Sequence, residues 1–249
     1  MLLGLVAFGL IEPRGVGLFD RHDRIDRRDE GVQLNRVNIG CGGSLVAVGR
    51  VGVLRNGRGG YQRGRLYRCL DSHGNIDITE AIEKSCNTFF YAKMDEMMGR
   101  HGLNVWTELM REFGLGRRNN IDLTNEIRAL VPDSTYFDRA FGVRKWGIGD
   151  LINLGIGQGP MGASPLQLAV AAATLANGGV RPQPHLVNRI SYERGVDDVL
   201  EPELARLDWI TEDMMAPIQQ GMRQVVTNGS GRFYANLSDV EVAGKTGTA

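Results

Sequence analysis

Lysine is scarce in this chain, and its placement excludes one kind of chemistry. Of the 29 basic residues other than histidine, the lysines are Lys84, Lys93, Lys145 and Lys245. Three positions before them stand Ala81, Phe90, Gly142 and Val242. A serine one helical turn before a lysine is one arrangement that activates a hydroxyl as a nucleophile. No Ser-x-x-Lys occurs anywhere in the sequence, so the chain lacks that nucleophile.

Cysteine is also scarce, and histidine falls at no spacing typical of a metal site. The chain has 3 cysteines, Cys41, Cys69 and Cys86, with no Cys-x-x-Cys pair. We therefore predict no metal, no cofactor and no disulfide framework. A Cys69–Cys86 bridge stays open as an alternative in an oxidising compartment.

An excess of charge and a long apolar run are both missing. The net charge is +0 over 249 residues, which gives no indication of nucleic acid or an anionic membrane as a partner. The apolar run 1–11 is ended by Glu12 and Pro13, well short of the roughly 20 residues that cross a bilayer. It also lacks the basic start and the cleavage site of a secretory signal. We expect neither an anchor nor a signal in this chain.

The first sixty residues differ in composition from the rest. Residues 1–60 contain no lysine and are rich in arginine and glycine, and most of this segment has no helical or strand period. Residues 44–48 alternate as a strand would. We interpret 1–60 as a poorly ordered segment, or as one that does not belong to the following domain, for instance through a reading-frame error. The domain proper is expected over 61–249.

From residue 61 onward, helix signals follow one another. The expected helices span 78–84, 88–98, 104–113, 164–176 and 211–226. Asp77 and Glu80 form a capping box, Asn87 can cap the second helix, and Ser164 with Pro165 opens the fourth. The segment 240–244 alternates like a strand that leads into Lys245. A chain that stops at Ala249 beside this strand leaves a sheet without its next strand, so we expect it to be cut there.

Two short motifs carry possible chemistry. In Lys245-Thr246-Gly247-Thr248, the ammonium and the first hydroxyl can hold a carboxylate, and the Thr248 amide can donate into an oxyanion hole. Gly247 would allow another backbone to approach closely. Taken alone, a Lys-Thr-Gly sequence arises often by chance and is more often a surface turn. Ser85-Cys86-Asn87 by itself is a common helix cap.

A third feature gives these motifs a context. Gly155-Ile156-Gly157-Gln158-Gly159, Ser164-Pro165-Leu166-Gln167 and Ala176-Asn177-Gly178-Gly179 follow one another in the order typical of class B penicillin-binding proteins. Further matching segments, in order, are Tyr67-Arg68-Cys69, His73-Gly74-Asn75-Ile76, Ile121-Asp122-Leu123, Trp146 with Gly149-Asp150, and Val242 to Ala249. Over about 61–249 the sequence therefore resembles the transpeptidase domain of that family, and its elongation-type penicillin-binding protein 2 more than the division type.

The resemblance implies a fold and an activity. The fold is α+β, similar to serine β-lactamases, with a helical lobe on an antiparallel sheet, here truncated at both ends. The activity is that of a serine-type D,D-transpeptidase, which cross-links peptidoglycan stem peptides and binds β-lactams. Family members work with a membrane glycosyltransferase on the periplasmic face of the bacterial inner membrane.

The resemblance also assigns roles to residues. Ser85 would relay a proton to the leaving group, and Asn87 would hold the acyl-donor amide. Lys245 and Thr246, followed by Gly247, would bind the substrate carboxylate. Thr248 would supply one oxyanion amide.

The departures from the family pattern limit this assignment. Ser-x-x-Lys would stand before residue 61 and is absent, so we expect the chain to be inactive. The anchor and dimerisation region that precede the domain, and the strands after Ala249, are also missing. Asn120 and Thr124 stand where the family more often has glycine and proline. Alternative functions are a non-catalytic module that binds carboxylates or β-lactams, and a structural subunit of the wall-synthesis complex; a free-standing β-lactamase is disfavoured.

Overall fold

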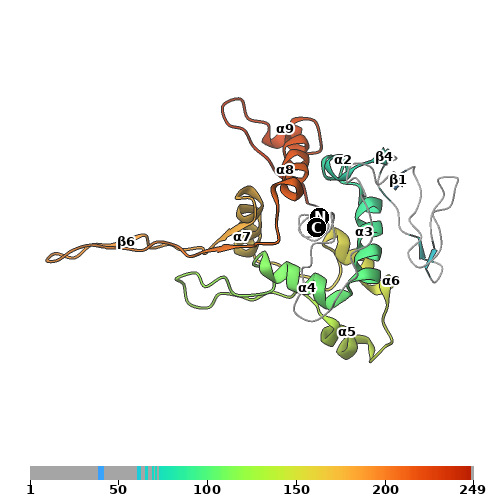
Figure 1. Ribbon diagram of the computed structural model, residues 1–249, viewed down its shortest axis with the longest axis horizontal. Coiled ribbons are helices and arrows are strands. Elements are labelled where there is room, and N and C mark those ends of the chain that lie inside the picture. Colours follow the sequence, from blue (N-terminus) through green and yellow to red (C-terminus); the bar gives the residue numbers. More distant parts are fainter. Residues whose placement is uncertain are drawn as a thin grey trace, which may run out of the picture.

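The structure is a computed structural model that describes residues 39–41, 61–62, 65–66, 69, 71 and 73–247 of the chain. The described part contains helices of four to sixteen residues and short strands (Figure 1). No helix within it is both long and apolar enough to cross a membrane. The predicted strand at 44–48 and most of the segment 1–60 lie outside the described residues.

Two helices joined at Ser85 form the first structured unit. Helix α2 (Ile78–Glu83) begins at the predicted capping box, in which Asp77 accepts from the Glu80 amide and Glu80 from the Asp77 amide. Helix α3 (Asn87–Arg100) follows after a sharp turn. The predicted cap by Asn87 is wrong: Cys86 is the residue that precedes the first turn, no side chain caps that turn, and Asn87 is already helical.

Helix α4 and the later α6 and η1 pack against α3. Helix α4 (Leu103–Glu112) confirms the third prediction to within a residue, and Phe113 with Gly114 at φ +88° ends it. Helix α5 (Ser134–Phe141) is capped by Asp133. The short α6 (Ile148–Leu151) and the 3₁₀ helix η1 (Ile152–Ile156), which begins the Gly-Ile-Gly-Gln-Gly segment, lie against α3. The large buried side chains of this core include Phe90, Trp106, Phe113 and Phe137.

Helix α7 (Pro165–Ala176) matches the predicted boundaries. The Ser164 hydroxyl accepts from the Gln167 amide at 3.2 Å, and the Gln167 side chain accepts from the Ser164 amide at 3.0 Å. Gln167 is fully buried, and its Nε2 donates to the carbonyls of Arg117 and Arg128. The Ser-Pro-Leu-Gln segment thus fixes the loop between α4 and α5 as well as its own helix start.

Helix α8 (Glu212–Thr227) begins after Thr211, as predicted, and lies along α2 (Figure 1). Its early Pro217 is tolerated, and the carbonyl of Pro217 accepts from the Thr79 hydroxyl at 3.2 Å. At the crossing, a Cβ on Gly221 would meet the Thr79 carbonyl oxygen and the Ile82 Cβ, each at 2.9 Å. The two helices are therefore in contact at the backbone. A short helix, α9 (Arg232–Ala235), follows.

In the part of the chain that the structure describes, the strands form four two-stranded antiparallel sheets. The pairs are β1 (Ile39–Cys41) with β4 (Gly74–Ile76), β2 (Tyr61–Gln62) with β3 (Arg65–Leu66), β5 (Val180–Pro182) with β8 (Leu204–Arg206), and β6 (Arg189–Ile190) with β7 (Asp198–Val199). The β6–β7 pair extends away from the helical body as a narrow arm (Figure 1). Asp122 holds its base by accepting from the Leu186 and Val187 amides, both at 2.8 Å.

The predicted strand at 240–244 is wrong. The segment has no regular secondary structure, and within the described residues no strand pairs with it. A strand depends on a neighbouring backbone, and here side-chain and backbone groups of α8 take that place. The Gly244 amide donates to the Met222 carbonyl at 3.0 Å, and Arg223 donates to the Val242 carbonyl at 2.9 Å.

Candidate active site

Ser85 is positioned by the way α2 ends. The Cys86 amide donates to the Ala81 carbonyl at 2.9 Å, and the Ser85 amide donates to the Ile82 carbonyl at 3.3 Å. These two hydrogen bonds are the pair that defines a Schellman motif. That motif requires a left-handed residue, and Ser85 has φ +55° where glycine is the usual choice. A side chain in this conformation costs about 1–2 kcal/mol. This left-handed conformation places the Ser85 hydroxyl at the turn between the two helices.

Lys245 is positioned from the other side, by α8. The backbone bonds of Val242 and Gly244 to this helix hold the segment that leads into Lys245. Because α8 also packs closely on α2, the end of α2 and the segment along α8 meet. The close approach at Gly221 is what allows this meeting.

Ser85 and Lys245, 160 residues apart, are in contact. The Lys245 ammonium donates to the Ser85 hydroxyl, and to the hydroxyl and carbonyl oxygens of Thr246, both at 3.1 Å. Ser230 extends the group, since its hydroxyl lies 2.7 Å from the Thr246 hydroxyl. A helix cap and an unrelated surface turn would not produce this convergence.

The electrostatics of the group follow from the burial of Lys245. Loss of water around the ammonium lowers its pKa from the ordinary 10.5 to about 8. Lys245 is therefore a cation at neutral pH that releases its proton more readily than an exposed lysine. Within the described residues, no carboxylate forms an ion pair with it, and its partners are neutral oxygens.

The other predicted site residues are placed less fully. Asn87 begins α3 two positions after Ser85 and is half-buried, but no hydrogen bond joins its side chain to Lys245 or Thr246 in the described part. Gly247 is exposed, and no described atom lies within 4 Å of the position of a Cβ there. The close backbone approach expected at Gly247 therefore stays a prediction. Thr248 lies outside the described residues.

Sequence reasoning missed Ser230 and the helix contacts that bring the motifs together. Ser230 follows Gly229, where a Cβ would meet the Glu83 carbonyl oxygen at 2.7 Å. The turn after α8 therefore touches the end of α2. Gly229 and Ser230 belong to none of the motifs. The only local signal was the Gly-Ser pair itself, which after a long helix indicates a turn.

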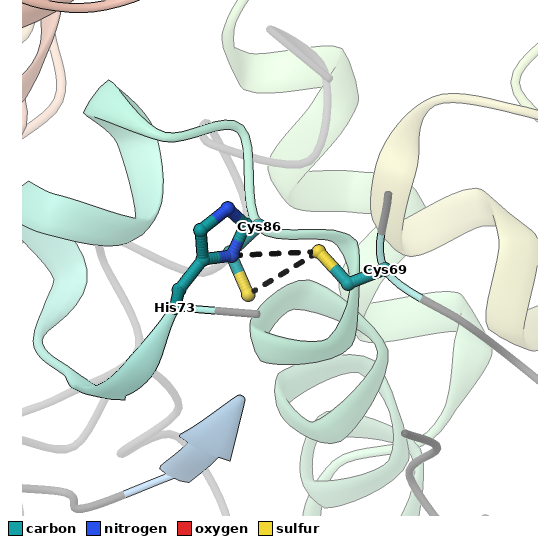
Figure 2. Close-up of side chains that lie close together, drawn as sticks. All are labelled: Cys69, His73 and Cys86. Carbon is teal, nitrogen blue, oxygen red and sulfur yellow. Dashed lines mark hydrogen bonds between the residues drawn. The ribbon is translucent and has the colours of Figure 1, made fainter. Parts of the chain in front are cut away.

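A second cluster of side chains includes Cys86, the residue that follows Ser85. Figure 2 shows the sulfurs of Cys69 and Cys86 and the Nδ1 of His73 facing one another. The sulfurs are 3.8 Å apart, and the Cys69 sulfur is 3.6 Å from His73 Nδ1. The Cys86 thiol, with the amides of residues 88, 71 and 87, holds the pKa of the Cys69 thiol well below its ordinary value.

The sequence spacing of these three residues did not indicate a site, but the fold brings their ligand atoms within 4.8 Å of one another. Two thiols and an imidazole are donors of the kinds that soft divalent cations such as zinc accept. The cluster could hold such an ion; our prediction of no metal rested on linear spacing alone.

The comparisons with known proteins agree with the order of motifs. Residues 56–249 match the family described as the penicillin binding protein transpeptidase domain. The chain belongs to this family.

Within the family, the chain is similar to the peptidoglycan D,D-transpeptidases MrdA of Haemophilus influenzae and Acinetobacter baumannii. It is 36% identical to the first over 181 residues and 34% to the second over 178, in each case covering 71% of this chain. The matches cover 27% and 25% of those relatives, so the chain spans about a quarter of their length. The predicted likeness to the elongation-type branch is confirmed.

Solved structures confirm the fold class. The chain superposes with a TM-score of 0.61 on Pseudomonas aeruginosa penicillin-binding protein 2 in complex with WCK 5153, at 30% identity, covering 82% of this chain and 44% of that one. A peptidoglycan synthase complex gives a TM-score of 0.70 at 24% identity, over 99% of this chain and 35% of that one, which speaks for the fold alone. The expected α+β class holds, with its antiparallel pairs small and separate in the described residues.

Proposed function

We propose that this chain is the stem-peptide-binding part of an elongation-type peptidoglycan D,D-transpeptidase, and that by itself it binds the donor peptide without forming an acyl-enzyme. The observation that carries the proposal is the contact of Lys245 with Ser85 and Thr246. Two motifs that the family uses on one substrate meet in space, although 160 residues of sequence separate them.

The cation of this group supports carboxylate binding. Lys245 uses its donors on neutral oxygens, which an anionic oxygen can replace with a stronger, charge-assisted bond. Thr246 then adds a hydroxyl donor to the same carboxylate. The ligand class is a peptide ending in D-alanine, or a β-lactam that carries its carboxylate at the equivalent place.

The Ser85 hydroxyl suits the relay of a proton. It accepts from Lys245, and its own O–H remains able to donate to the atom that leaves. The lowered pKa of Lys245 favours replacement of that proton from the ammonium. Asn87 and the Thr248 amide would orient the peptide and its carbonyl.

The step that this arrangement does not provide is nucleophilic attack. A covalent acyl transfer needs an activated hydroxyl that becomes the ester. The chain has no Ser-x-x-Lys to supply it. We therefore propose that the chain is enzymatic by family and inactive by itself.

A non-catalytic module that binds carboxylates or β-lactams is the second candidate function, because the carboxylate-binding residues are the part that meets in the structure. The relatives suggest where either function would operate. One solved neighbour is Helicobacter pylori penicillin-binding protein 2 in complex with MreC, and another is a peptidoglycan synthase complex. By analogy we infer a place on the periplasmic face of the inner membrane, beside a membrane glycosyltransferase.

Two measurements on the purified chain test the proposal. Incubation with a fluorescent penicillin followed by a denaturing gel should give no labelled band, whereas a penicillin-binding protein with Ser-x-x-Lys labels under the same conditions. A labelled band at full chain mass would contradict the proposal that the chain forms no acyl-enzyme. Saturation-transfer NMR with N-acetyl-D-alanyl-D-alanine should show binding that Lys245→Met abolishes and the exposed control Lys145→Met retains. Equal binding by both variants would contradict the carboxylate site.

A further inference from the structure

Segment 139–145, which is the end of α5 and the loop that leads to α6, combines exposed apolar and basic side chains. It lies at the lower edge of the helical body in Figure 1. The apolar members are Phe141, 50% exposed, and Val143, 71% exposed. The basic members are Arg139, Arg144 and Lys145, and all three are exposed. Three positive charges therefore accompany two apolar side chains that the fold does not bury.

A tight turn gives the segment a defined shape. The Lys145 amide donates to the Gly142 carbonyl at 3.0 Å, which closes a β-turn. The two residues at the tip of this turn are Val143 and Arg144. Arg144 has a φ of +59°, a left-handed conformation that is unfavourable for its side chain. The turn thus presents one apolar and one basic side chain to solvent, next to each other.

Aromatic packing holds the base of the turn. The ring of Phe141 stacks on the buried Phe137 with the centroids 5.8 Å apart, and the Trp146 ring lies 5.4 Å from the same side chain. Trp146 Nε1 donates to Asp138 at 2.7 Å. Asp138 is the only carboxylate in residues 134–146. Among the described residues, no carboxylate forms an ion pair with any of the three basic side chains.

Charge distinguishes segment 139–145 from the other groups of exposed apolar side chains in the described part of the chain. Each of the others contains carboxylates: Asp122 and Glu126 in the loop after α4, Glu193, Asp197 and Asp198 in the β6–β7 arm, and Asp239 and Glu241 after α9. The net charge of +0 gave no indication of this difference, because acidic residues elsewhere balance the local excess. Segment 139–145 therefore suits a partner that is anionic and also offers an apolar layer.

We propose that segment 139–145 docks on the surface of an anionic lipid bilayer, with Val143 below the headgroups and the basic side chains among them. A bilayer surface places a negatively charged layer over an apolar one, which matches an apolar tip flanked by basic residues. The stems of arginine and lysine can lie along apolar surface while their charges stay at the level of the headgroups. This inference is independent of the proposed function, because it uses none of the site residues.

Co-sedimentation of the purified chain with vesicles tests the proposal. We expect binding at low salt to vesicles of equal parts phosphatidylglycerol and phosphatidylcholine, and none to phosphatidylcholine alone. Added salt should weaken the binding, because it screens the attraction. Each basic residue near an anionic surface contributes about fivefold to binding, so Arg144→Asn/Lys145→Gln should bind about 25-fold more weakly. Asparagine tolerates the left-handed conformation, so the turn is kept. Absence of binding by the unsubstituted chain would overturn the proposal.

Val143→Ser separates a bilayer from an acidic protein partner. This variant keeps every charge and removes only the apolar tip, so its binding to the anionic vesicles should fall several-fold while its binding to soluble polyglutamate is unchanged. Vesicle binding equal to that of the unsubstituted chain would contradict insertion into a bilayer and favour an acidic protein.

The β6–β7 arm offers a matched control. Arg194→Asn/Val196→Ser removes one exposed basic and one exposed apolar side chain between the two strands. We expect this variant to bind the anionic vesicles as the unsubstituted chain does, and thermal unfolding checks that all variants are folded. A loss as large as that of Arg144→Asn/Lys145→Gln would show a general effect of charge and overturn the assignment to segment 139–145.

Discussion

Ser85 combines a strained backbone with a hydroxyl that contacts Lys245. Its φ of +55° completes the end of α2, and its side chain receives the Lys245 ammonium. A glycine would satisfy the turn without strain but would supply no hydroxyl. Serine at this position therefore costs local backbone strain and in return supplies the oxygen that contacts Lys245.

This compromise predicts the ranking of two substitutions at Ser85. Both Ser85→Gly and Ser85→Ala remove the hydroxyl, but only glycine removes the Cβ that is unfavourable at positive φ. We expect Ser85→Gly to be about 1 kcal/mol more stable than Ser85→Ala in urea denaturation. Equal stabilities would show that the left-handed conformation carries no cost in this turn.

The lowered pKa of Lys245 predicts how ligand binding depends on pH. The Lys245 ammonium, which we propose binds a carboxylate, is fully present only well below its pKa of about 8 and is lost as the pH rises through that value. Affinity for N-acetyl-D-alanyl-D-alanine, measured by NMR titration, should fall between pH 7 and pH 9.5. Lys245→Arg keeps its charge over this range, so the affinity of that variant should stay level. A parallel fall in both proteins would assign the effect to another group.

At the scale of elements, the crossing of α2 and α8 decides whether the site exists. Thr79 bonds to the Pro217 carbonyl, and Gly221 brings the two backbones together. These contacts hold the two motif-bearing segments side by side. None of the residues in the crossing carries the proposed chemistry.

Gly221→Ala tests the crossing. The added methyl would meet the Thr79 carbonyl oxygen and the Ile82 Cβ at 2.9 Å, and backbone cannot move aside cheaply. We expect a loss of about 1–3 kcal/mol in unfolding free energy, together with weaker ligand binding. Gly99→Ala is the matched control: Gly99 lies in α3, a Cβ there would meet nothing within 4 Å, and alanine favours a helix. If Gly221→Ala were as stable as Gly99→Ala, the close crossing would not be needed.

At the scale of the whole molecule, the β6–β7 arm stands apart from the helical core. All four of its strand residues are exposed, and none belongs to the buried cluster that unites the helices. At its base the Leu200 amide donates to the Asn188 carbonyl at 2.9 Å. The arm is thus closed on itself before it leaves the body (Figure 1).

Removal of the arm should therefore leave the body folded. Replacing residues 189–199 by Asn-Gly would join the paired Asn188 and Leu200 through a tight hairpin turn. We expect the unfolding free energy to change by less than about 1 kcal/mol, because the deleted side chains bury little apolar surface. Circular dichroism during thermal unfolding measures this. A large loss of stability would mean that the arm packs on the body.

The sequence by itself determined the local elements and the family. The capping box at Asp77 and the Ser164-Pro165 pair gave α2 and α7 nearly to the residue, because such signals act within a single turn. The departure at Asn120 is also local: its φ of +58° is one that asparagine adopts more easily than most side chains, so it can replace a glycine. The order of motifs identified the family, and the absence of Ser-x-x-Lys was visible without any fold.

Only the tertiary structure decided which of these residues meet. Alternation at 240–244 predicted a strand, but the Gly244 amide donates to the Met222 carbonyl of α8. The spacing of residues along the chain does not determine which carbonyl a backbone amide will meet. The contacts of Ser85 with Lys245 and of Cys69 with Cys86 span 160 and 17 residues. The first of these contacts depends on how closely α2 and α8 can pack, and that depends on Gly221, which lies outside every motif.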